Sequence, residues 1–128
     1  MDNALIKLLA IATGGAVGAV LRFAIANGAH MLLGRGFPYG TLIVNVLGSL
    51  GIGIVYVLFL ERLSLGPEWR AAIQVGLLGA LTTFSTFSME TLLLLESGET
   101  QKAVINVILN VFLCLAATWA GMILGRQI

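Results

Sequence analysis

The sequence predicts an all-α integral membrane protein with four membrane-spanning helices. Charged residues make up 10% of the 128 residues and apolar residues 59%, where soluble domains have roughly 25% and 45–50%. Four long apolar runs fill nearly the whole chain, and a helix needs about 20 such residues to cross a bilayer. The runs are continuously apolar rather than alternating, which favours helices over barrel strands. We therefore expect a single membrane domain over residues 1–128.

The composition excludes several other classes of protein. Seven Lys and Arg residues against six Asp and Glu give a net charge of +1, so no basic patch for nucleic acid is present. The single cysteine, Cys114, excludes an internal disulfide and a Cys-only metal site. With one histidine, His30, no His/Cys/carboxylate cluster can hold zinc, and the serines lack a basic partner. We therefore expect neither an enzyme nor a nucleic-acid partner.

We expect the four helices at residues 4–33, 40–61, 68–96 and 101–126, within one lipid-embedded unit. The connections at residues 34–40, 61–68 and 97–102 are rich in Gly, Pro and charged residues, which are typical of turns. Aromatic residues stand near the predicted ends of the spans, as the membrane interface favours: Phe37, Tyr39, Trp69 and Trp119.

The positive charges are almost evenly divided between the two sides of the membrane. Four cations lie on the side of the N-terminus: Lys7, Arg62, Arg70 and Arg126. Three lie on the other side: Arg22, Arg35 and Lys102. An excess of Lys and Arg normally orients a membrane protein. A difference of four to three fits either one weakly biased orientation or insertion in both directions and pairing with an inverted copy.

Polar residues inside the spans lie on stripes. In the second span, Thr41, Asn45 and Ser49 are four residues apart and share one helical face. The fourth span repeats this spacing at Asn106, Asn110, Cys114 and Thr118. The two stripes indicate either hydrogen bonds between helices or a polar path through the protein. Small residues four apart, such as Gly14 and Gly18 or Gly121 and Gly125, predict close helix approach within one subunit or between copies.

The third span contains an unusual polar segment at residues 79–88. Five hydroxyl residues and two phenylalanines follow Gly79, and such residues loosen a helix. We expect a break there, which at membrane depth requires burial in protein or a cavity. A broken helix frees carbonyls for a cation and amides for an anion. Phe84 and Phe87, three residues apart, either pack ordinarily or present their electropositive edges to an anion.

The chain resembles the fluoride channel family, Fluc, also called CrcB. The string GLLGALTTFSTFSME at residues 76–90 is similar to the family signature, and GTLIVN at residues 40–45 resembles its second-span motif. The pattern Gly14-Gly15, Gly18, Leu21-Arg22 resembles the first span, and Gly66-Pro67-Glu68-Trp69 the approach to the third. The resemblance covers all four spans in order.

The resemblance implies a fluoride-selective passive channel in the cell inner membrane that exports cytoplasmic fluoride. Family members are antiparallel homodimers with two pathways per dimer, which makes a second copy of the chain the implied partner. The resemblance assigns to the fluoride pathway Asn45, Phe84, Phe87, Asn106, Asn110, Ser85, Thr86 and Ser88. Thr41 shares the face of Asn45 and is included with them.

A structural sodium ion between the two subunits is also implied by the resemblance. Its ligands match the backbone carbonyls of Gly79 and Thr82, whereas Arg22 and Glu90 match residues at the vestibules. Two residues depart from the pattern of many relatives: Ala80 replaces a Gly beside the sodium site, and Cys114 replaces a Ser. Neither departure removes a pathway residue.

Two other functions fit a small four-helix membrane protein. A proton-coupled multidrug-type exporter requires a membrane-embedded acid, and the first span has none. A scaffold subunit without transport activity would show changes of assembly, but not of ion flux, when the polar stripes are mutated.

Replacing Glu90 by Gln distinguishes the exporter from the channel. We expect Glu90→Gln to have a mild effect on transport, because a channel does not need an alternately protonated acid. Transport by reconstituted protein is the measurement, with Glu96→Gln on the same helix as the control. Complete loss in Glu90→Gln alone would favour the exporter.

Overall fold

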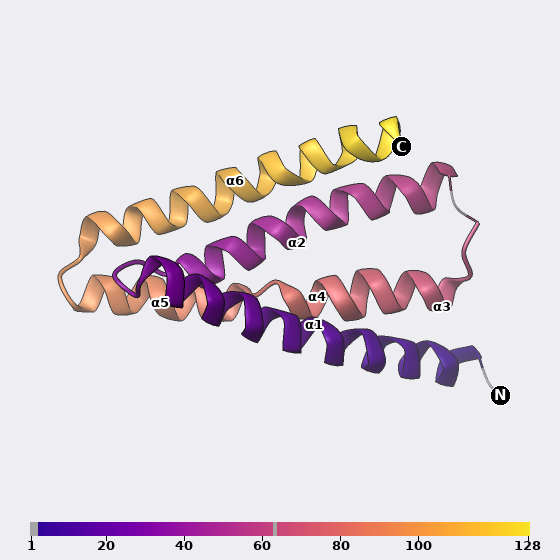
Figure 1. Ribbon diagram of the computed structural model, residues 1–128, viewed down its shortest axis with the longest axis horizontal. Coiled ribbons are helices and arrows are strands. Elements are labelled where there is room, and N and C mark those ends of the chain that lie inside the picture. The colour runs from indigo at the N-terminus through magenta and orange to yellow at the C-terminus, as the bar shows by residue number, and fades with distance from the viewer. Residues whose placement is uncertain (1–2, 63) are drawn as a thin grey trace.

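The computed structural model describes residues 3–62 and 64–128, and these residues fold into helices and short connections only (Figure 1). Met1, Asp2 and Leu63 lie outside the described residues. Four segments are long and apolar enough to cross a membrane: Asn3–Leu33, Tyr39–Arg62, Pro67–Glu96 and Thr100–Gln127. The prediction of an all-helical chain with four candidate membrane spans is confirmed.

Three of the spans are nearly continuous helices. The first span is α1 (Asn3–Leu33), and the fourth is α6 (Thr100–Gln127). The second span is α2 (Tyr39–Val57), which continues as the π-helical segment η1 (Leu58–Arg62). Gly34 and Gly98, with φ of 85° and 83°, follow the ends of the first and third spans, where glycine adopts this backbone without strain.

The third span is built from four helical pieces. It begins with α3 (Pro67–Arg70), where Pro67 occupies the first turn, and continues as the π-helical segment η2 (Ala71–Leu78). A short helix α4 (Gly79–Leu81) follows, and then α5 (Phe84–Glu96). Thr82 and Thr83 between them have extended backbone, with φ/ψ of −86°/157° and −151°/120°.

The helices pack mainly as two pairs. α6 lies along α2, and α1 lies along η2 and α4 (Figure 1). The start of α1, the end of η1, the start of α3 and the end of α6 lie at the same end of the molecule. The segments at this end carry Lys7, Arg62, Arg70 and Arg126.

Glycines bring the backbones of paired helices into direct contact. A Cβ on Gly53 of α2 would overlap the Thr118 carbonyl of α6, and one on Gly121 would overlap the Leu50 carbonyl of α2. Gly14 and Gly18 of α1 face the carbonyls of η2 in the same way. These small residues therefore serve packing within the subunit, which was one of the two alternatives the spacing left open.

The α2–α6 contact provides a stability test. We expect Gly53→Ala to lower the free energy of unfolding by about 1–3 kcal/mol, because the methyl group would overlap backbone that cannot move aside. Gly28→Ala on α1 is the matched control, since no atom lies within 4 Å of its added Cβ. Thermal unfolding in detergent measures both, and equal midpoints for the two variants would contradict the packing.

Candidate functional site

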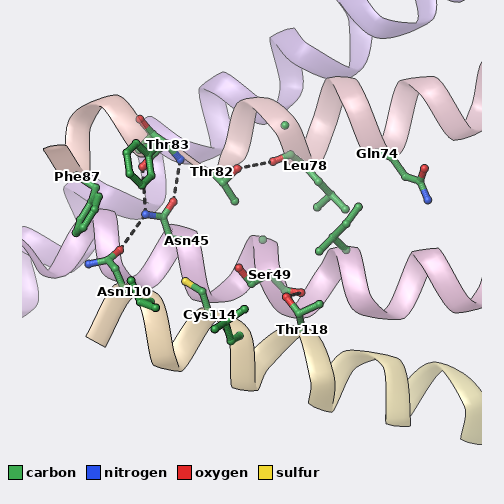
Figure 2. Close-up of a pocket in the computed structure, with 16 residues that line it drawn as sticks. Asn45, Ser49, Gln74, Leu78, Thr82, Thr83, Phe87, Asn110, Cys114 and Thr118 are labelled. Carbon is green, nitrogen blue, oxygen red and sulfur yellow. Dashed lines mark hydrogen bonds between the residues drawn. The ribbon is translucent and has the colours of Figure 1, made fainter. Parts of the chain in front are cut away.

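The side chain of Asn45 on α2 pairs with both main-chain groups of Thr83. The Thr83 amide donates to Asn45 Oδ1 at 2.8 Å, and Asn45 Nδ2 donates to the Thr83 carbonyl at 3.2 Å (Figure 2). Both residues are buried, with 9% and 8% of their surface exposed. Because these backbone groups are outside any helix, the Asn45 amide supplies the partners that burial demands.

The hydrogen bonds continue from Asn45 through the fourth span and back to the third. Asn45 Nδ2 also donates to Asn110 Oδ1 at 3.0 Å. Asn110 Nδ2 donates to the carbonyl and to Oδ1 of Asn106, at 2.9 and 3.0 Å. Asn106 Nδ2 donates to Thr91 Oγ1 at 3.0 Å, and Thr91 Oγ1 donates to the Phe87 carbonyl at 2.7 Å. We call Asn45, Asn110, Asn106 and Thr91 the amide relay.

Local packing brings the extended segment onto α2. A Cβ on Gly48 would overlap the methyl group of Thr82, so the glycine lets Thr82 lie directly against the helix. The Thr82 amide and hydroxyl both donate to the Leu78 carbonyl at 3.2 Å. Thr83 then begins α5, because its hydroxyl accepts the Thr86 amide at 3.2 Å as an N-terminal cap.

The remaining hydroxyl residues gather around this cap. Thr83 Oγ1 donates to Thr86 Oγ1 at 3.1 Å and lies 3.4 Å from Ser85 Oγ. Ser85 and Thr86 are exposed and Ser88 is half-buried. Thr41 is buried at 5% exposure, and its hydroxyl makes no hydrogen bond among the described residues. Of these hydroxyl residues, Ser85 and Thr86 are thus the ones exposed at the surface of the single subunit.

Phe84 and Phe87 form an edge-to-face pair at the start of α5. Their ring centroids are 5.2 Å apart and their planes meet at 61°. Phe87 is buried at 7% exposure, whereas Phe84 is 76% exposed. Such a geometry turns an electropositive ring edge toward its neighbour.

A cavity of about 510 Å³ lies between the second, third and fourth spans. Its lining residues include Asn45, Thr83 and both phenylalanines, the polar side chains of Ser49, Gln74, Cys114 and Thr118, and apolar side chains such as Leu78 and Leu115 (Figure 2). Thr118 Oγ1 donates to the Ser49 carbonyl at 3.0 Å, so the two polar stripes also meet here. The stripes therefore provide hydrogen bonds between helices and also line a cavity.

The carbonyls of Gly79 and Thr82 lack the amide partners that a continuous helix would give them. In a continuous helix they would accept from the amides of Thr83 and Thr86, but these donate to Asn45 Oδ1 and Thr83 Oγ1. The Ala80 methyl lies toward Gly18 of α1, since a Cβ on Gly18 would approach it to 3.1 Å.

Arg22 and Glu90, predicted at the vestibules, take no part in the amide relay. Arg22 is half-buried on α1 and forms no ion pair or hydrogen bond with the described residues. Glu90 Oε1 on α5 is buried and has no hydrogen-bond partner within them. The described part of the chain contains no group of three His, Cys, Asp or Glu residues that could hold a metal ion.

Three residues of the site were missed from the sequence. Thr83 was counted only as one of five hydroxyls, although its main chain is the partner of Asn45. Thr91 offered a signal, because this hydroxyl residue stands directly before the apolar run Leu92–Leu95 and four residues after Phe87. Gln74 also offered a signal, because it stands in an apolar run. An amide inside a membrane span is costly unless polar groups surround it.

The fold and the site define a class of protein: a multi-pass membrane protein with a polar, uncharged site where two residues of extended backbone interrupt its third span. The family model of the CrcB-like protein, Camphor Resistance (CrcB), matches residues 9–122. The chain belongs to this family. It is a family of ion channels rather than enzymes, as the sequence predicted.

Several relatives carry the name "Fluoride-specific ion channel FluC". The protein of Shewanella amazonensis is 60% identical over 115 residues, which are 90% of this chain and 92% of that protein. The protein of Geobacter sulfurreducens is 49% identical over 121 residues, 94% of this chain and 98% of that protein. The protein of Methylococcus capsulatus is 54% identical over 123 residues, which are 96% of this chain but only 54% of the relative's length.

The pairing of Asn45 with Thr83 can be tested by a change of one group. We expect Asn45→Asp to lower the free energy of unfolding by about 1–3 kcal/mol or more, because a carboxylate has no donor for the Thr83 carbonyl or for Asn110. Thermal unfolding in detergent is the measurement. Asn3→Asp, at an exposed position of α1, adds the same charge as a control. Equal stability of both variants would refute the pairing.

Proposed function

We propose that the chain is a fluoride-selective passive ion channel. The observation that carries the proposal is the interruption at Thr82–Thr83, where neutral amides hold extended backbone within a candidate membrane span. The name of the relatives, which are 46–60% identical to this chain, supports fluoride as the ion. Export of cytoplasmic fluoride through the cell inner membrane is part of the proposal.

The chemistry of the site suits a small, strongly hydrated anion. The amides of Phe84 and Ser85 make no hydrogen bond among the described residues, and they stand at the positive end of the α5 dipole. The hydroxyls of Ser85, Thr86 and Ser88 and the ring edges of Phe84 and Phe87 add neutral donors. Because none of these groups carries a full charge, binding stays weak enough for the ion to leave.

The asparagines have a different part in this proposal. Asn45 Nδ2 donates to the Thr83 carbonyl and to Asn110 Oδ1, and Asn110 Nδ2 donates to the carbonyl and to Oδ1 of Asn106. Asn45, Asn106 and Asn110 therefore form the pathway wall and fix its shape, with Thr41 beside them. The ion contacts the amides, hydroxyls and ring edges at the start of α5, and these asparagines hold that segment in place.

We further propose that two copies assemble as an antiparallel homodimer with two pathways. Phe84 is exposed and the cavity is open at the surface of a single subunit, and the few polar groups that line this cavity would be costly to leave against lipid. A second copy covers this face. The division of cations, four against three, permits the two copies to insert in opposite orientations.

A structural sodium ion is proposed at the carbonyls of Gly79 and Thr82, with Arg22 and Glu90 at the vestibules. The diverted helical donors of the two carbonyls support the site. When bound, sodium supplies positive potential close to the pathway. This chain's own contribution is to keep the two oxygens free of amide donors.

A proton-coupled exporter is the second candidate. The buried Glu90 Oε1, which has no hydrogen-bond partner among the described residues, favours it, because an exporter of this kind needs an acid within a membrane span. The interrupted span and the names of the relatives favour the channel.

Fluoride efflux from liposomes tests the proposed function. We expect purified protein to release fluoride rapidly down its gradient, read with a fluoride electrode, and to release negligible chloride in a parallel assay. A pH gradient should not be required, because nothing in the pathway needs to bind and release a proton. Folded, dimeric protein that released no fluoride would contradict the channel and favour proton-coupled export.

A further inference from the structure

The amide relay has one direction, which its two ends determine. At one end the Thr83 N–H can only donate, so Asn45 must turn its oxygen toward it. At the other end the Phe87 carbonyl can only accept, so the Thr91 hydroxyl must donate to it. Every amide between these ends donates toward Thr91, and turning one amide over would place donor against donor or oxygen against oxygen.

Thr91 is the group that closes the relay. Its hydroxyl hydrogen is used by the Phe87 carbonyl at 2.7 Å, which leaves the oxygen to accept from Asn106 Nδ2 at 3.0 Å. Thr91 is 9% exposed and Asn106 is fully buried. Without the hydroxyl, the buried Asn106 amide would lose the acceptor of its Nδ2 donor.

The relay returns to the helix from which it starts. Thr83 caps the N-terminus of α5, and Phe87 lies one turn further along the same helix. The first turn of α5, which bears Phe84, Ser85 and Thr86, is thus held at both ends by one set of hydrogen bonds. The amides, hydroxyls and ring edge of these three residues are among the donors proposed to contact the fluoride ion.

We propose that Thr91 is a positioning residue of the fluoride pathway. Its hydroxyl fixes the orientation of three asparagine amides and, through them, the first turn of α5. Thr91 itself does not touch the ion. This role rests on the proposed function, because its effect is measured as a change in the rate of fluoride permeation.

The test compares three variants in the liposome assay. Thr91→Val keeps the shape and removes the hydroxyl, whereas Thr91→Ser keeps the hydroxyl. Thr13→Val is the matched control, because the Thr13 hydroxyl also donates to the carbonyl four residues earlier, at 2.9 Å, but lies on α1 outside the relay. Two quantities are read: the rate of fluoride release and the fraction of trapped fluoride that is released.

We expect Thr91→Val to slow fluoride release about tenfold, since it leaves a buried donor of the relay unpaired. The released fraction should be unchanged, because that fraction counts the vesicles that hold any working channel. Thr91→Ser and Thr13→Val should match the parent protein in both quantities. A merely structural role would instead lower the released fraction and leave the rate of the remaining channels intact.

Each alternative result has a definite meaning. If the parent protein and Thr91→Val release fluoride at the same rate, the positioning role is wrong and the channel stands. If the parent protein releases none, the proposed function fails and the role of Thr91 fails with it. If Thr91→Val does not fold, Thr91→Cys replaces it, because a thiol is a weaker donor and acceptor. Slowed release by Thr91→Cys supports the role, and the parent rate overturns it.

Discussion

Main-chain amides and carbonyls at membrane depth must have hydrogen-bond partners, and the site depends on how this chain meets that requirement. Thr82 and Thr83 interrupt the third span, so the backbone of Thr83 loses its helical partners. Asn45 supplies both of them from the neighbouring helix. A single asparagine thereby makes an extended segment stable where lipid would otherwise forbid it.

The rest of the structure serves this pairing. Gly48 allows Thr82 to lie against α2, and Gly53 and Gly121 bring α6 close enough for Asn110 to reach Asn45. The amides of Thr83 and Thr86 donate to side-chain oxygens. In a continuous helix the same amides would donate to the carbonyls of Gly79 and Thr82. One interruption therefore creates free oxygens on its N-terminal side and free amides on its C-terminal side.

The sequence predicted the spans because hydropathy alone determines them, and it placed Asn45, Asn106 and Asn110 on polar stripes. It could not pair them. Asn45 and Thr83 are 38 residues apart and Asn45 and Asn110 are 65 apart, so neither contact follows from helical spacing. Thr91 was missed because a single threonine in a leucine-rich run is common. The π-helical stretches η1 and η2 were also not predicted.

Solid-state NMR of the protein in liposomes would test the central claim most directly. Fluoride is itself the probe, through dipolar coupling between fluorine and ¹³C or ¹⁵N labels on the Ser85 amide and the Phe87 ring. The account predicts that both labels lose signal to the bound ion, and that Asn45→Asp abolishes the effect. Loss of signal only at cations near the ends of the spans, such as Arg35 and Lys102, with Ser85 and Phe87 unaffected at saturating fluoride, would contradict it.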